Sequence, residues 1–181
     1  MRSVKIPSDR IGTLVGKNGE TKRMIEKRAG IRLNISKEGD ILFNEEAKGV
    51  DPLKALMLMD VLKAVGRGFN PDRAVRLFEE DEYFETFDLK DVAGDKTNQL
   101  ERVRGRLIGA GGRTRQIIEE LTGCYMSVYG NTVSLIGNSV SLPVAKHAVE
   151  LILNGSEHAT VYRYLESQRP KLRIAEMGFD L

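Results

Sequence analysis

Apolar and polar positions alternate at the start of the chain and then repeat every three or four residues. The alternation predicts a strand over residues 1–7, which ends at Pro7 because proline cannot donate to a strand ladder. Ile11, Leu14 and Val15 have the i, i+3, i+4 spacing of an amphipathic helix. A strand followed directly by a helix is therefore expected.

The rest of the first half continues this pattern. A second helix is expected to end at Gly30, because glycine suits a helix C-terminus. Residues 31–35 and 41–43 read as two strands joined by a polar turn, and Asp51 and Pro52 begin a long apolar helix. The order strand, helix, helix, strand, strand, helix predicts an α+β fold.

The same order returns in the second half, after a short helix and an acidic run. Strands are expected over residues 83–89, 124–128 and 132–136, with helices over 96–108, 142–153 and 157–168. The chain is thereby divided into a first domain (1–70), a helical and acidic linker (71–82), a second domain (83–155), and a C-terminal helix with a basic tail (156–181).

A four-residue loop framed by Gly109 and Gly112 separates two helices of the second half. A helix that stops and restarts so quickly needs left-handed backbone angles and leaves no room for a Cβ, which glycine satisfies. The first N–H groups of the restarted helix lack intrahelical acceptors and carry the positive end of its macrodipole. A phosphate is the expected ligand, although a single Gly-x-x-Gly occurs in many turns.

The loop occurs twice, at a constant offset of 93 residues from Gly16 to Gly109. An offset that holds from before the loop to the end of the next helix indicates a duplicated domain. The other matching pairs are Gly12 and Gly105, Thr21 and Thr114, Lys22 and Arg115, Ile25 and Ile118, Glu26 and Glu119, and Gly30 and Gly123.

Residues 15–25 and 108–118 resemble the signature of the KH domain, a module that binds RNA or single-stranded DNA through its Gly-x-x-Gly loop. The resemblance implies two type I KH domains (β-α-α-β-β-α), each a three-stranded antiparallel sheet with helices on one face, followed by a C-terminal helix. Residues 148–155 leading into 161–162, with the tandem domains and compact length, resemble the partner-of-Nob family of ribosome-assembly proteins.

The second resemblance implies a non-catalytic protein that binds the 3′ end region of small-subunit ribosomal RNA during ribosome assembly or rRNA processing. It further implies an rRNA-processing endonuclease or a translation initiation factor as a protein partner. The alternative is an adaptor that uses the KH scaffold to recruit such a protein. Binding to a short unpaired RNA without any partner would discriminate the two.

Both loops supply candidate RNA-binding residues, because their amides are expected to take phosphates beside neighbouring cations. These candidates are Gly16, Lys17, Asn18, Gly19 and Lys22 in the first copy and Arg104, Arg106, Gly109, Ala110, Gly111, Gly112, Arg113 and Arg115 in the second. Bases are expected to be read by Arg32, Asn34, Tyr125 and Ser127, whose strand neighbours point inward.

Charge is unevenly distributed although the formal net charge is only +2. The first 40 residues hold ten Lys or Arg against five Asp or Glu, whereas residues 79–95 hold eight acidic side chains and one basic one. The single Cys124 excludes a disulfide within the chain and fits a reducing compartment. Without a transmembrane run or a signal-peptide core, we expect a soluble cytoplasmic protein without a membrane partner.

Catalysis and cofactors are not expected. His147 and His158 lack a Cys or carboxylate cluster at metal-ligand spacing, and the loops do not have the spacing of a nucleotide-binding P-loop. The acidic residues of 79–95 fall in a linker without fixed geometry, which argues against a Mg²⁺ nuclease site.

Overall fold

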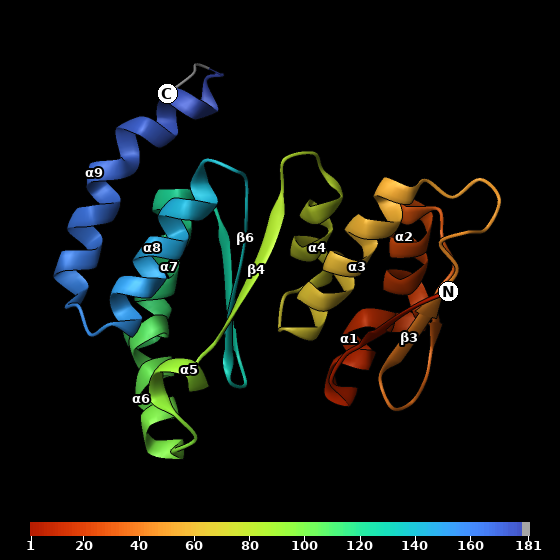
Figure 1. The fold of residues 1–181 in the computed structure, drawn as a ribbon, viewed down its shortest axis with the longest axis horizontal. Helices are drawn as coiled ribbons and strands as arrows, with labels where there is room; N and C mark the ends of the chain where they lie inside the picture. Colours follow the sequence, from red (N-terminus) through yellow and green to blue (C-terminus); the bar gives the residue numbers. More distant parts are fainter. Residues whose placement is uncertain (179–181) are drawn as a thin grey trace. The chain divides into compact units, whose positions relative to one another are not determined.

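The computed structural model describes residues 1–178, which divide into two units between Phe84 and Glu85, each with its own sheet (Figure 1). The first unit contains β1 (Arg2–Lys5), η1 (Ser8–Arg10), α1 (Ile11–Val15), η2 (Lys17–Gly19), α2 (Glu20–Ala29), β2 (Asn34–Ile35), β3 (Asp40–Phe43), α3 (Pro52–Gly66), α4 (Pro71–Ala74) and η3 (Val75–Phe78), where η marks 3-10 turns.

The sheet of the first unit is antiparallel, with strand order β1-β3-β2. Val4 and Ile35 both face Ile41 of the central strand, and Ile41 is fully buried. Leu14 of α1 and Ile25 of α2 are also fully buried, which fits the apolar stripes read from the sequence.

The second unit repeats this arrangement, with a sheet in the order β4-β6-β5. The predicted α+β class with two three-stranded antiparallel sheets is confirmed. The elements are β4 (Tyr83–Asp88), α5 (Lys90–Ala93), α6 (Thr97–Ile108), η4 (Ala110–Gly112), α7 (Arg113–Thr122), β5 (Tyr125–Tyr129), β6 (Thr132–Gly137), α8 (Ser141–Leu153) and α9 (His158–Glu176).

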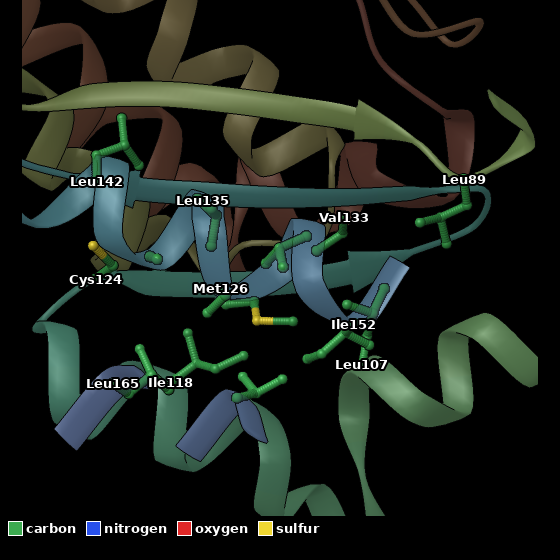
Figure 2. Packing of buried hydrophobic residues seen from close by; sticks show 14 residues of the cluster. Leu89, Leu107, Ile118, Cys124, Met126, Val133, Leu135, Leu142, Ile152 and Leu165 are labelled. Carbon is green, nitrogen blue, oxygen red and sulfur yellow. The ribbon is translucent and has the colours of Figure 1, made fainter. Parts of the chain in front are cut away.

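One apolar cluster joins the sheet of the second unit to its helices (Figure 2). Met126 of β5 and Leu135 of β6 project toward Ile118 of α7, and Leu165 of α9 lies in the same cluster. All four side chains are at most 1% exposed. The C-terminal helix is therefore part of the core of this unit rather than an appendage.

Helix α9 runs further than the sequence pattern suggested. Residues 169–173, expected as a basic tail, continue the helix to Glu176. Pro170 removes one backbone donor, but Leu172 is buried and anchors the last turns. A second difference is that β2 is only two residues long, so Ile31 and Leu33 are buried outside the ladder. Within residues 1–178, no helix has the length and apolar character needed to cross a membrane.

A glutamate fixes the start of the strand after the second helix in both units. Glu26 accepts a hydrogen bond from the amide of Leu33 through Oε2 (2.7 Å), and Glu119 accepts one from Met126 in the same way (2.9 Å). These four residues are related by the offset of 93. The repeated carboxylate thus holds the strand that borders each loop-bearing helix pair.

We expect Glu119→Ala to lower the stability of the second unit by about 2 kcal/mol, because a hydrogen bond to a charged group is lost and the Met126 amide is left without it. Native-state hydrogen exchange of the β5 and β6 amides measures this change. Glu120→Ala is the control, since Glu120 is exposed and bonds only Gln116 on its own helix among the hydrogen bonds described. Equal effects of the two changes would contradict the role given to Glu119.

Candidate nucleic-acid interface

The two glycine-framed loops have the same backbone conformation. Gly16 and Gly109 end the helices that precede the loops, with φ/ψ of 75°/177° and 77°/169°. Gly19 and Gly112 begin the helices that follow, with 75°/12° and 78°/12°. The repeated sequence thus adopts the same loop conformation in both units.

The first glycine of each loop is required by space as well as by φ. A Cβ on Gly109 would overlap the side chain of Thr114 and lie 2.6 Å from its backbone nitrogen. A Cβ on Gly16 would lie 2.7 Å from Cβ of Thr21, the matching threonine. The loop backbone therefore rests directly on the first turn of α2 or α7.

The third loop position is left-handed in both copies, but different residues occupy it. Asn18 has φ 54° and ψ 24°, and Gly111 has φ 60° and ψ 21°. Asparagine is the non-glycine residue that tolerates this region best. The conformation is thus kept while the side chain changes.

Peptide donors lie open at the tips of both loops. Lys17, Asn18, Ala110 and Gly111 are exposed, and within residues 1–178 their amides have no hydrogen-bond acceptor. Neither following helix receives a side-chain N-cap. Each loop therefore presents bare N–H groups at the positive end of a ten-residue helix, as an anion site requires.

Cations surround these donors, more one-sidedly in the second unit. The first turn of α7 holds Arg113 and Arg115 and no acidic residue, whereas α2 begins with Glu20. Cations at a helix N-terminus are unfavourable by about 0.3–1 kcal/mol when no anion is bound. The charge pattern of α7 therefore suits an anionic ligand better than it suits the free helix.

The individual cations differ in how available they are. Arg113 is exposed, and Arg115 lies 3.6 Å from Glu119 across one helical turn. In the first unit Lys17 is exposed and Lys22 half-buried, and the guanidinium of Arg23 lies beside Gly19. Arg23 was not among the candidates taken from the sequence, although its i+4 spacing from Gly19 could have placed it at the loop.

The two arginines that precede the second loop differ in their surroundings. Arg106 donates to the backbone carbonyls of Ile152 (2.7 Å) and Ser156, so its guanidinium is occupied by the end of α8. Arg104 is half-buried, and its buried Nε has no hydrogen-bond partner within residues 1–178. The guanidinium of Arg106 is therefore engaged at the end of α8, whereas a role for Arg104 in binding RNA stays a prediction.

Three of the four residues expected to read bases lie on edge strands, and Arg32 lies just before β2. Asn34 belongs to β2 and Tyr125 and Ser127 to β5, which are the outer strands of the two sheets. Arg32 and Asn34 are exposed, while Tyr125 and Ser127 are half-buried beside the buried Met126. Their side chains alternate with core side chains, as the sequence pattern requires.

Family models match both halves of the chain. A model described as "KH domain" matches residues 1–47, and one described as "Eukaryotic type KH-domain (KH-domain type I)" matches residues 83–170. A KH domain-containing protein of Methanocaldococcus jannaschii is 42% identical over 172 residues, covering 95% of this chain and 75% of that protein.

Two further relatives carry more informative names. The pre-rRNA-processing protein pno1 of Schizosaccharomyces pombe is 31% identical over 147 residues, which are 80% of this chain and 61% of pno1. The chain thus spans less than two thirds of that relative. The Dim2p chain in an a/eIF2α–Dim2p–rRNA complex from Pyrococcus horikoshii is 47% identical, with a TM-score of 0.87 and 94% of each chain covered.

Proposed function

Since this chain belongs to the PNO1/Dim2 family of tandem KH-domain, pre-rRNA-processing RNA-binding proteins, we propose that it binds the 3′ end region of small-subunit ribosomal RNA. The family is non-catalytic, so the role of the protein is to hold RNA rather than to cleave it. The cytoplasm is the proposed compartment, in keeping with one free, buried cysteine.

The observation that carries the proposal is the pair of open loops with identical backbone geometry. Each offers two amides on exposed residues that have no acceptor in the described part of the chain, at Lys17 and Asn18 and at Ala110 and Gly111. A nucleic-acid backbone supplies phosphates at regular intervals, and contacts to phosphate fix where the strand lies without reading its sequence. The loops are therefore the positioning part of the interface.

We assign base recognition to residues on or next to the edge strands β2 and β5. Arg32 and Asn34 offer guanidinium and amide groups, and Tyr125 and Ser127 offer hydroxyls, all suited to the Watson–Crick edges of unpaired bases. A base paired in a duplex has those edges occupied. The proposed substrate is accordingly single-stranded.

Two weak sites in one chain give a tighter overall complex. Once one loop holds the RNA, the other meets it at the effective concentration set by the chain between them. The gain requires an RNA long enough to reach both loops. A short RNA that fills one loop is expected to bind more weakly than a longer one of the same composition.

A second role as an adaptor is favoured by one finding, the complex of P. horikoshii Dim2p with both rRNA and a/eIF2α. By similarity we propose a translation initiation factor of this class as a protein partner of this chain. An rRNA-processing endonuclease is the other partner that we propose for a pre-rRNA-processing protein. In both proposals the protein binds RNA and a second protein.

The test is a titration of the purified chain with a short unpaired RNA, without any partner, at increasing salt. We expect binding, with a slope of log K against log salt of about 0.7 per phosphate neutralised. Engagement of both loops would involve about four to eight phosphates and give a slope of about 3 to 6. Fluorescence anisotropy of labelled RNA measures both quantities.

Two results would count against the proposal. Absence of binding until a protein partner is added would favour the adaptor role alone. A slope near 1 would mean that one loop, or neither, contacts the RNA backbone. A duplex of the same sequence is the control and should bind less tightly, because its base edges are paired.

A further inference from the structure

The first turns of α9 touch the helix that follows the second loop. The hydroxyl of Tyr162 lies 2.9 Å from Oγ1 of Thr114, the second residue of α7. Thr114 is 1% exposed and Tyr162 is half-buried, so the Thr114 hydroxyl is shielded from water. Thr114 is also the residue on which Gly109 rests. Thr114 therefore contacts both Tyr162 of α9 and the backbone of the loop.

The same part of α9 holds the helix that precedes the loop. His158 Nε2 lies 2.9 Å from the carbonyl oxygen of Arg106, and because a carbonyl can only accept, Nε2 carries the proton. The Arg106 side chain reaches back to the carbonyls of Ile152 and Ser156 at the junction of α8 and α9. Side chain and backbone of one residue therefore link α6 to this junction.

The rings of His158 and Tyr162 stack on one another, with centroids 6.0 Å apart and an angle of 14° between their planes. The two contacts are therefore made by side chains one helical turn apart on α9 whose rings also contact each other. One ring holds the last turn of α6 and the other the first turn of α7. The loop from Gly109 to Gly112 lies between these two points.

The first unit has no equivalent arrangement. Thr21, the counterpart of Thr114, is half-buried and makes no side-chain hydrogen bond among residues 1–178. Arg10 does donate to the carbonyls of Val65 (2.8 Å) and Phe69 (2.9 Å), but it lies before α1, two helical turns from the loop. The second loop alone is supported on both flanks within the described part of the chain.

We propose that α9 positions the second loop for phosphate binding, with Tyr162 and His158 as positioning residues. This inference rests on the proposed function. A loop already held in its binding geometry loses less freedom when the ligand arrives, and a loop that is competent only part of the time binds more weakly by that fraction. Removing the Tyr162 hydroxyl leaves Thr114 buried without this partner and loosens the first turn of α7.

We expect Tyr162→Phe to weaken RNA binding about threefold to tenfold and to speed hydrogen exchange at the loop about tenfold. The amides to follow are those of Gly109 and Gly112, which donate to the carbonyls of Gly105 (2.8 Å) and Gly109 (3.1 Å). Tyr164→Phe is the matched control, because Tyr164 lies two residues along the same helix and its hydroxyl makes no hydrogen bond within residues 1–178. The control should leave both quantities unchanged.

Threonine 114 provides the test from the other side of the bond. Thr114→Ser keeps a hydroxyl and should retain RNA affinity, whereas Thr114→Val should match Tyr162→Phe. Combining Thr114→Val with Tyr162→Phe should add little to either single change, since both remove the same hydrogen bond. If Tyr162→Phe folds poorly, the comparison of Thr114→Ser with Thr114→Val still tests the role of this hydrogen bond.

The outcomes separate this inference from the proposed function. Faster exchange at Gly109 and Gly112 in the free Tyr162→Phe protein supports positioning even if the wild-type chain fails to bind RNA, a failure that would overturn only the proposed function. Unchanged loop exchange would overturn the inference. So would a loss of affinity no larger than that of Tyr164→Phe, or full additivity in the double variant.

Discussion

Replacing Ala110 and Gly111 together by aspartate is expected to weaken RNA binding at least tenfold while leaving the fold intact. Both residues are exposed, and their amides lack acceptors within residues 1–178. Two carboxylates would stand where phosphates are expected. Like charges about 4 Å apart repel by about 1 kcal/mol even in water, so two such pairs correspond to roughly thirtyfold.

The fold should tolerate this change for a reason found in the first unit. Asn18 occupies the position of Gly111 with nearly the same φ and ψ. Aspartate is the closest isostere of asparagine and shares its tolerance of the left-handed region. A Cβ at Gly111 meets no atom within 4 Å. Strain and clash at position 111 are therefore expected to be small.

The matched control is Ala110→Asn with Gly111→Asn, which adds the same bulk without charge. We expect it to bind RNA within about threefold of the wild type, because the amides stay open and no anion is introduced. Anisotropy at one fixed salt concentration compares the three proteins, and circular dichroism checks that each is folded. Equal losses in the Asp and Asn variants would indicate a steric rather than an electrostatic effect, and unchanged affinity in a folded Asp variant would contradict the loop as the phosphate site.

Much of the fold follows from local patterns in the chain. Alternation at Ile31 and Leu33 and helical spacing at Leu14 and Ile25 each place apolar side chains on one face, and all four are buried. Binary patterning of this kind largely decides which face of an element enters the core. The fold class can therefore be predicted from the sequence without knowledge of tertiary contacts.

The positions of the two glycine-framed loops could be predicted because the loop sequence occurs twice. The repeat fixed their position, and the structure shows the same positive φ at Gly16 and Gly109. Their need for glycine has a specific cause, the close approach to Thr21 and Thr114, which belong to the same repeat. A pairing of glycine and threonine five residues apart in both copies was the available indication of this contact.

Long-range partners could not be read in the same way. Arg106 looks like an RNA-binding arginine from its neighbours in sequence, yet its acceptors lie 46 and 50 residues away. The bond between Thr114 and Tyr162 spans 48 residues and has no counterpart in the first unit to reveal it. Local patterns specify faces and turns, but which polar groups meet depends on how the helices pack.

The largest effect on stability is expected for Gly109→Ala, at about 3 kcal/mol or more for the second unit. At φ 77° and ψ 169° a residue with a Cβ is strained by about 1–3 kcal/mol. The added methyl group would also overlap Thr114, and overpacking of this kind costs about 1–3 kcal/mol. The overlap involves the backbone of α7, which cannot move aside as a flexible side chain would. Native-state hydrogen exchange of the β5 and β6 amides gives the change in free energy.

Gly112→Ala separates the two causes. Gly112 also has a positive φ, 78°, but its ψ of 12° lies in the ordinary left-handed region and a Cβ there meets nothing within 4 Å. We expect a loss of only about 1 kcal/mol, the strain of a left-handed alanine. Gly16→Ala should repeat the large effect in the first unit, because Thr21 lies beneath it as Thr114 lies beneath Gly109. If Gly109→Ala and Gly112→Ala destabilise equally, the positive φ alone sets the requirement for glycine, and the close approach of loop and helix contributes nothing.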